Sequence, residues 1–271
     1  MNEEQRRHWY NLRFVQFEIV KCLKHRELSF LSMKGTPDRK RAVRYLLAFS
    51  IDYLNKHWEW FNFMRSPLNM YQSVALLKPE VPVFSYNLKE RTSEEEYVKF
   101  GKEFDKYVES YNFLIDLDGD DTENLLGEAM VIKRVLDEFQ VPYYVLNSSK
   151  KGFHFVIPAE FMPHYDNPLD LLNIISDSAV NLKGIYMLKG MDSTIYDNKR
   201  ICKVPYSYSC DDCICLPLND EQLENFTPEM VSFGNVMSTI MIRDRGLQLR
   251  THNQTEETLK LNVRMFLDEF K

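Results

Sequence analysis

The chain has 271 residues, of which 44% are hydrophobic and 13% aromatic, with a formal net charge of −6. This composition supplies a core for one large or two small domains, and it leaves no room for added helicase, nuclease or ligase modules. No stretch approaches the roughly 18 to 20 apolar residues of a membrane span, and residues 1–7 lack a signal-peptide core. We therefore expect a cytoplasmic protein with no membrane partner.

The amino-terminal third alternates predicted helices and strands. Periodicity predicts helices over residues 4–24 and 38–65 with a strand at 26–30 between them. A strand at 71–77 follows, and then an amphipathic helix over 93–110 that begins at a Ser-Glu-Glu-Glu start.

The central part predicts a compact α+β unit. Strand 111–118, helix 123–139, strands 142–147 and 153–158, helix 168–182 and strand 200–206 follow one another. This βαββαβ order predicts an antiparallel sheet backed by two helices, the architecture also used by RNA-recognition domains. The tail contains a predicted helix at 220–226, an apolar run at 236–242 and an amphipathic helix at 256–270 that we expect to pack on the sheet.

The apolar strand 111–118 ends in acid, with Asp116, Asp118 and Asp120 in alternation. Side chains two apart in a strand share a face, so Asp116 and Asp118 point the same way. Two carboxylates this close repel each other unless a divalent cation lies between them. A solvated acidic turn is the alternative. A calcium loop is excluded because Asp121 occupies the position that needs glycine.

Two further segments carry polar chemistry. The turn from Ser148 to His154 joins two predicted strands, and its hydroxyls, lysines and Gly152 suit phosphate oxygens, although a plain hairpin is the alternative. Downstream, Asp192 adds a third acid before the basic strand that carries Arg200 and Lys203. A buried Lys203 would require an anion, whereas on an edge strand it would contact water.

In order and together, these segments resemble the motifs of the archaeo-eukaryotic primase superfamily. The shared features are a strand ending in Asp-x-Asp, a Ser-x-x-x-Gly-x-His turn, and a later Asp before a basic strand ending in Pro-x-Ser. Upstream, three more segments resemble replicative primase small subunits, namely His25-Arg26-Glu27-Leu28-Ser29-Phe30, Val43-Arg44-Tyr45 and Met70-Tyr71-Gln72-Ser73-Val74-Ala75. The resemblance spans roughly residues 20–218.

The resemblance implies the archaeo-eukaryotic primase fold in a single catalytic domain. Residues 1–110 would form an amino-terminal α/β lobe, 111–218 an RRM-like catalytic lobe and 219–271 a helical tail. Asp116, Asp118 and Asp192 would be catalytic and would hold two Mg²⁺ or Mn²⁺ ions. The implied nucleotide-binding residues are Ser148, Ser149, Lys151, His154, Lys203, Arg200, Arg44, Arg26 and Glu27.

The chain departs from the family pattern in two places. Ser149 stands where relatives often have glycine, and no cysteine lies between Asp121 and Asn147, where replicative primase small subunits usually carry a zinc-binding insertion. Four other cysteines, Cys202, Cys210, Cys213 and Cys215, lie near one another in sequence. We do not expect zinc there, because the usual signature has two separated CxxC pairs.

The resemblance implies a DNA primase and polymerase that makes primers on a single-stranded DNA template and extends them from dNTPs or NTPs by two-metal catalysis. The alternatives are a gap-filling end-joining polymerase, a metal-dependent phosphodiesterase and a non-catalytic nucleic-acid binding module. The compact size points by analogy to a mobile-element or CRISPR-associated enzyme, with or without a large-subunit-like partner. Residues 1–50 hold 11 Lys and Arg against 5 Asp and Glu, which suits a nucleotide cleft beside an acidic centre.

Overall fold

The computed structural model describes residues 3–32, 41–46, 50–52, 54–55, 68–81, 86–87, 90–91, 94–209, 212–240 and 247–271. Its helices are α1 (Glu3–Asn11), α2 (Arg13–Cys22), α4 (Glu94–Glu103), α5 (Thr122–Glu138), α6 (Pro168–Tyr186), α7 (Asp220–Glu224), α8 (Phe233–Ile240) and α9 (Glu256–Phe270). Its strands are β1 (Leu28–Ser32), β2 (Arg41–Leu46), β3 (Leu68–Ser73), β4 (Ala75–Leu77), β5 (Tyr86–Asn87), β6 (Glu90–Arg91), β7 (Val108–Tyr111), β8 (Phe113–Leu117), β9 (Tyr144–Asn147), β10 (Phe153–Ile157), β11 (Ile201–Lys203), β12 (Tyr208–Ser209), β13 (Cys213–Ile214) and β14 (Pro217–Leu218).

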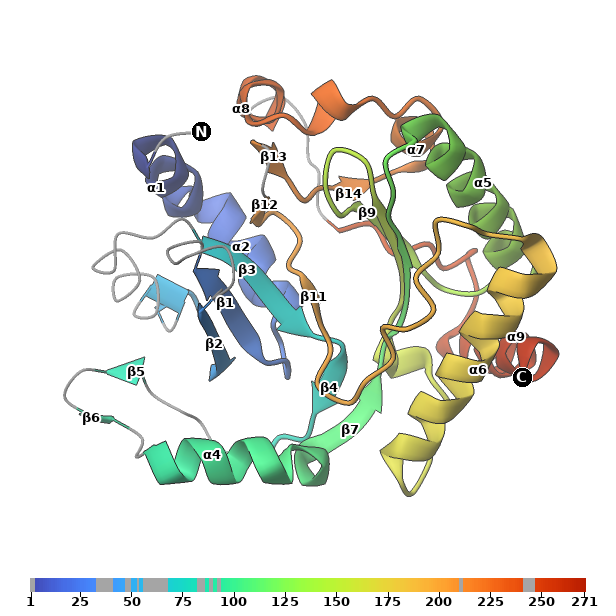
Figure 1. Cartoon of the computed structure of the whole chain (residues 1–271), viewed down its shortest axis with the longest axis horizontal. Coiled ribbons are helices and arrows are strands. Elements are labelled where there is room, and N and C mark those ends of the chain that lie inside the picture. Colours follow the sequence, from blue (N-terminus) through green and yellow to red (C-terminus); the bar gives the residue numbers. More distant parts are fainter. Residues whose placement is uncertain are drawn as a thin grey trace.

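Two antiparallel sheets of four strands organise the molecule. The amino-terminal sheet has the order β11-β3-β1-β2, and the carboxylate sheet, named for the aspartates on β8, has the order β14-β9-β10-β8. Figure 1 shows the amino-terminal sheet on the left, the carboxylate sheet on the right and β11 between them. Helices α5, α6 and α9 cover the outer face of the carboxylate sheet (Figure 1).

The two faces of the carboxylate sheet differ in polarity because side chains alternate along each strand. On β8, Phe113, Ile115 and Leu117 are fully buried in the main core, which they share with the buried residues of the covering helices. The opposite, inner face carries Leu114 and then Asp116. Leu114 belongs to a second apolar cluster with Tyr144, Leu146, Val156 and Cys202. The inner face is therefore apolar at one end and polar at the other.

The predicted strand 200–206 does not join the carboxylate sheet. Its regular part, β11, pairs with β3 at the edge of the amino-terminal sheet, with Cys202 opposite Gln72. The place beside β8 is taken instead by a short segment in which Met191 bridges to Leu117. β14 adds to the far side of β9, with Pro217 opposite Leu146. The basic strand thus faces the carboxylates from the other sheet, an arrangement that chain order alone does not reveal.

Three predicted helices differ from the structure. The helix expected over 4–24 is divided at Leu12 into α1 and α2, and the last residues of 93–110 form β7, which pairs with β4. The helix expected over 38–65 is wrong in its first part, because residues 41–46 form β2 and pair with β1. Residues 56–65 of that prediction lie outside the described residues. Long-range strand pairing overrides local periodicity at β2 and β7.

The remaining elements follow the sequence closely. α5, β9, β10, α6 and α7 lie within a few residues of their predicted positions, and α9 spans 256–270 as expected. Helix α9 buries Leu259, Val263, Phe266 and Phe270 in the main core, which it shares with the carboxylate sheet. In the part of the chain that the structure describes, every helix is too short or too polar to cross a membrane.

Candidate active site

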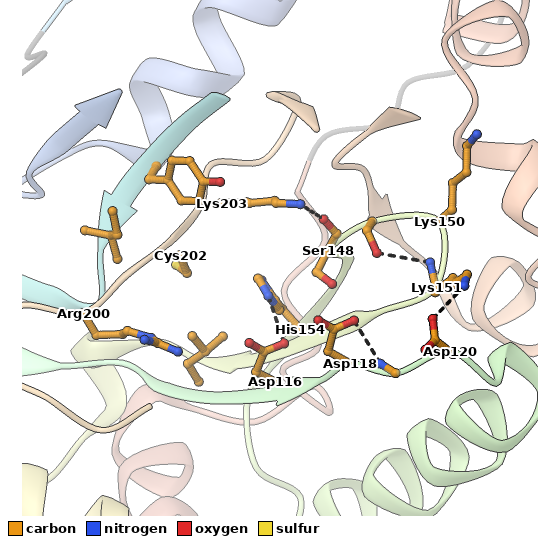
Figure 2. Close-up of a pocket in the computed structure, with 15 residues that line it drawn as sticks. Asp116, Asp118, Asp120, Ser148, Lys150, Lys151, His154, Arg200, Cys202 and Lys203 are labelled. Carbon is orange, nitrogen blue, oxygen red and sulfur yellow. Dashed lines mark hydrogen bonds and ion pairs between the residues drawn. The ribbon is translucent and has the colours of Figure 1, made fainter. Parts of the chain in front are cut away.

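A cavity of about 880 Å³ opens between the polar end of the inner face and the edge strand β11. It gathers residues from three parts of the chain that the sequence singled out separately. Its charged and polar lining comprises Asp116, Asp118, Asp120, Ser148, Ser149, Lys150, Lys151, His154, Arg200 and Lys203. In Figure 2, Asp116 and Asp118 lie on one side of this cavity, and Lys203 reaches in from β11 on the other.

Asp116 is paired with His154 across the strand ladder. The two residues are register partners on β8 and β10, and His154 Nε2 lies 3.3 Å from Asp116 Oδ1. Burial by itself would raise the pKa of the Asp116 carboxyl, but His154 and the charges of Arg200 and Lys203 outweigh it and hold that pKa below its ordinary value. Asp116 is therefore an ionised carboxylate in a partly buried site.

Asp118 stands two residues further along, on the same side of the chain as Asp116, and is exposed to the cavity. Its Oδ1 accepts a hydrogen bond from the backbone N–H of Gly119 at 2.9 Å. The same oxygen would lie 3.5 Å from a Cβ added at Gly152, so the Ser148–Gly152 turn passes close to it. Two carboxylates thus face the cavity at the end of β8.

Asp192 lies opposite Asp116 but does not line the cavity. Its backbone N–H donates to the carbonyl of Asp116 at 2.9 Å, so the two residues are neighbours across the short pairing beside β8. The Asp192 carboxylate accepts hydrogen bonds from the N–H and the hydroxyl of Thr194, at 2.9 and 2.7 Å. The backbone of the third predicted acid therefore lies next to Asp116, while its carboxylate is turned toward Thr194 in its own loop.

The donor chemistry fits a divalent cation, since Asp116 and Asp118 offer the hard oxygen ligands that Mg²⁺ and Mn²⁺ take. In the conformation described, the pair is not completed by a third ligand. Among the residues that the structure describes, no three His, Cys, Asp or Glu side chains are grouped so as to hold a metal ion. Asp116 and Asp118 are the residues that would hold such an ion, with Asp192 adjacent.

The turn between β9 and β10 is tight enough to require glycine. Ser148 N–H donates to the Gly152 carbonyl at 2.9 Å. A Cβ at Gly152 would lie 2.8 Å from the backbone oxygen of Leu117, and the Ser148 hydroxyl would be closer still. The glycine lets the turn pack against the end of β8, which brings its backbone beside the carboxylates.

Lys203 holds this turn from the opposite sheet. Its ammonium group donates to the carbonyl of Ser148 and to the hydroxyl of Ser209. Lys203 is only half-buried, and its ammonium group contacts two neutral oxygens in place of an anion. Arg200, on the same edge, acts electrostatically on Asp116. Both cations of the predicted basic strand therefore face the carboxylate sheet.

Lys151 is directed away from the centre of the cavity. It forms an ion pair with Asp120, with Nζ 3.0 Å from Oδ1, and both side chains are largely exposed. Its backbone N–H donates to the Ser149 hydroxyl at 3.2 Å, so Ser149 shapes the turn. Figure 2 shows Lys150 at the rim, pointing away from the aspartates.

Sequence comparison finds no relative for this chain: no protein-family model matches, and no curated protein matches significantly. Solved structures do match. The polymerase domain of ligase D from Mycobacterium tuberculosis, in complex with DNA, has a TM-score of 0.52 and 13% sequence identity, covering 84% of this chain and 85% of that chain. This chain has the archaeo-eukaryotic primase-polymerase fold. The expected α+β fold and the resemblance on which it rested are confirmed at the level of the fold.

Two other solved structures match at lower TM-scores. The catalytic domain of primase RepB′ in complex with initiator DNA has a TM-score of 0.41 and 9% identity, covering 85% of this chain and 97% of that chain. The primase-polymerase domain of cyanophage S-2L has a TM-score of 0.40 and 12% identity, covering 83% and 94%.

Arg26 and Glu27 lie outside the cavity of this primase-polymerase fold. The buried Arg26 guanidinium donates to the carbonyls of Ser73 and Val74, at 3.3 and 3.1 Å, and to Asn112 Oδ1 at 2.7 Å. Glu27 is fully buried and accepts a hydrogen bond from the Ser29 hydroxyl. Arg26 therefore ties the amino-terminal sheet to the start of β8. Arg44 belongs to β2, and its side chain lies outside the described residues.

The cysteines near the site are buried. Cys202 and Cys215 belong to the apolar cluster of the inner face and form no disulfide, and Cys213 is buried in the main core. Burial raises the pKa of the Cys202 thiol to about 11 and raises that of Cys215 further. Such thiols keep their protons at neutral pH. Cys210 lies outside the described residues.

Polar or charged side chains outside the predicted set of site residues also line the cavity, among them Tyr71, Asp120 and Lys150. Asp120 and Lys150 adjoin the acidic and turn motifs, so proximity in sequence was the available signal. Tyr71 sits on β3 beside Lys203 of β11, its register partner. Its place at the cavity depends on the pairing of β11 with β3.

Proposed function

We propose that this chain is a template-dependent nucleotidyl transferase that makes primers on single-stranded DNA and extends them from dNTPs or NTPs. One observation carries the proposal. A single cavity holds the Asp116 and Asp118 carboxylates on one wall and the cations of the basic strand on the other. The negative charge of a nucleoside triphosphate must be neutralised as its nucleotidyl group is transferred and pyrophosphate leaves. The basic side chains would do this directly, and the carboxylates would do it by holding divalent metal ions.

The residues divide the work by position. Asp116 and Asp118 would hold Mg²⁺ or Mn²⁺, which when bound supplies Lewis-acid activation of a hydroxyl and charge neutralisation in phosphoryl transfer. Lys203 fixes the Ser148 end of the turn, whose backbone faces the carboxylates. Arg200 and His154 add positive or hydrogen-bonding groups beside Asp116. Catalysis would thus come mainly from positioning and electrostatics.

Gap filling during end joining is the second candidate. It is favoured because the structure that matches with a TM-score of 0.52 is the polymerase domain of ligase D. Such an enzyme would extend a primer without starting a strand. An accessory partner and a mobile-element or CRISPR setting stay predictions from the sequence.

The test is strand synthesis by the purified chain. We would supply Mn²⁺ or Mg²⁺, an unprimed single-stranded DNA template and labelled dNTPs or NTPs, with Asp116→Ala in parallel. Asp268→Ala on the exposed face of α9 is the matched control. New strands from the wild type and the control, and none from Asp116→Ala, would support the proposal and reveal the sugar preference.

The other outcomes assign the alternatives. Products that require a supplied primer would replace priming by gap filling. Shortening of the template in an Asp116-dependent manner would identify a phosphodiesterase. DNA binding without either reaction would identify a binding module or a subunit that requires its partner, and would overturn the proposal for the isolated chain.

A further inference from the structure

The segment that carries Asp192 is held beside β8 by very few bonds of its own. Asp118 N–H donates to the Gly190 carbonyl and Asp192 N–H donates to the Asp116 carbonyl, each at 2.9 Å. The pairing is a single bridge between Leu117 and Met191. So short a pairing at the edge of a sheet needs support from elsewhere to fix the position of Asp192.

Glu128 on α5 provides that support. Its Oε1 accepts the backbone N–H of Lys189 at 3.0 Å, and its Oε2 accepts that of Gly190 at 2.9 Å. Asn124, one turn earlier, donates to the same Oε1 at 3.1 Å and orients the carboxylate. Hydrogen bonds to an ionised acceptor are stronger than neutral ones. Both carboxylate oxygens are thus used on two consecutive amides of the Asp192 segment.

The place of Glu128 in α5 is otherwise apolar. It is only 9% exposed and stands between Leu125, Ala129 and Ile132 on the buried face of the helix. A carboxylate in such a place is costly unless it is paired. Its hydrogen-bond partners include the backbone amides of the segment that ends at Asp192.

Two more contacts fix the same segment. Lys183 of α6 donates from Nζ to the Met191 carbonyl at 2.6 Å. A Cβ added at Gly190 would lie 2.3 Å from Leu125 Cδ2 and 3.1 Å from Glu128 Oε2, so the backbone approaches α5 as closely as only glycine allows. The segment is held between α5, α6 and β8.

We propose that Glu128 is a positioning residue for Asp192. Its carboxylate sets the backbone of residues 189–192 against β8 and so holds Asp192 next to Asp116, at the border of the cavity that Asp116 and Asp118 line. This inference rests on the proposed function, in which Asp116 and Asp118 hold a divalent metal ion, and it adds Asp192 as the acid that would complete that site.

The experiment compares Glu128→Gln with Glu138→Gln, an exposed glutamate near the end of the same helix. Glutamine keeps the size of the side chain but turns an N–H toward a backbone N–H. Amide hydrogen exchange of residues 189–192 should rise at least about tenfold, while α5 and β8 stay protected. Mn²⁺ affinity, measured by electron paramagnetic resonance without nucleotide, should fall about 10- to 100-fold. Glu138→Gln should match the wild type.

The outcomes separate the two ideas. If Asp116→Asn binds Mn²⁺ as tightly as the wild type, the proposed function is overturned and this inference with it. The same holds if the wild type binds no Mn²⁺. Mn²⁺ binding that depends on Asp116 and is unchanged in Glu128→Gln would overturn the inference alone. Uniformly fast exchange across α5 and β8 in both Glu128→Gln and the milder Glu128→Asp would show that Glu128 supports the whole fold, and would also overturn the positioning role.

Discussion

His154 Nε2 lies 3.3 Å from Asp116 Oδ1, so an expected nucleotide-binding residue and an expected metal ligand are direct partners in this structure. The contact follows from the β8–β10 register, which sets them opposite each other. It helps to hold the pKa of Asp116 below its ordinary value, after burial has acted in the other direction. The charge on Asp116 is therefore built into the sheet before any ligand arrives.

Asp116→Asn should separate charge from structure. Asparagine retains an oxygen that can accept from His154 but loses the negative charge, so the fold should persist while nucleotidyl transfer falls by at least about 100-fold. Circular dichroism and strand-synthesis rates check the two parts. Asp268→Asn should leave both unchanged, and activity retained in Asp116→Asn would remove Asp116 from the catalytic group.

Gly152→Ala should destabilise the chain by about 1–3 kcal/mol, because the new methyl group meets the Leu117 carbonyl and the Ser148 hydroxyl. Gly127→Ala is the matched control. A Cβ at Gly127 meets no atom within 4 Å, and alanine in a helix interior should stabilise α5 by about 0.5–1 kcal/mol. Urea unfolding of both variants measures the difference, and equal effects would contradict the tight packing of the turn.

Arg26→Met should act on stability more than on nucleotide binding. The variant removes the hydrogen bonds of a buried guanidinium to Asn112 Oδ1 and to the Ser73 and Val74 carbonyls, which should cost about 1–3 kcal/mol of unfolding free energy. Arg26 does not line the cavity, so KM for nucleotide should change by less than about twofold at temperatures where the variant is folded. A large rise in KM with unchanged stability would instead place Arg26 at the nucleotide.

Cys202 and Cys215 should resist alkylation in the native state. Burial raises the pKa of Cys202 from 9.0 to about 11, so the folded protein keeps this proton at pH 8. The contribution of this protonated thiol to the free energy of unfolding is complete below pH 9.0. It is lost as the pH rises toward 11, because the thiol of the unfolded chain ionises first. Labelling at pH 8 with and without urea checks this. Rapid native labelling of either cysteine would contradict its burial.

Sequence patterns determined the local parts of the site. Alternation along β8 set Asp116 and Asp118 on the inner face and Leu117 in the core, as observed. The sequence also predicted the glycine-containing turn before β10 and the amphipathic helix α9. These features depend on residues close in the chain, where strand and helix periods act directly.

Only the tertiary structure decided which sheet each strand joins. Local pattern could not show that β11 pairs with β3, that residues 41–46 form a strand, or that Met191 takes the place beside β8. Nor could it show that the Glu128 carboxylate would accept hydrogen bonds from the backbone of the Asp192 segment. Strand partners and buried polar contacts are chosen by groups far apart in sequence, whose burial and hydrogen bonding outweigh local preference.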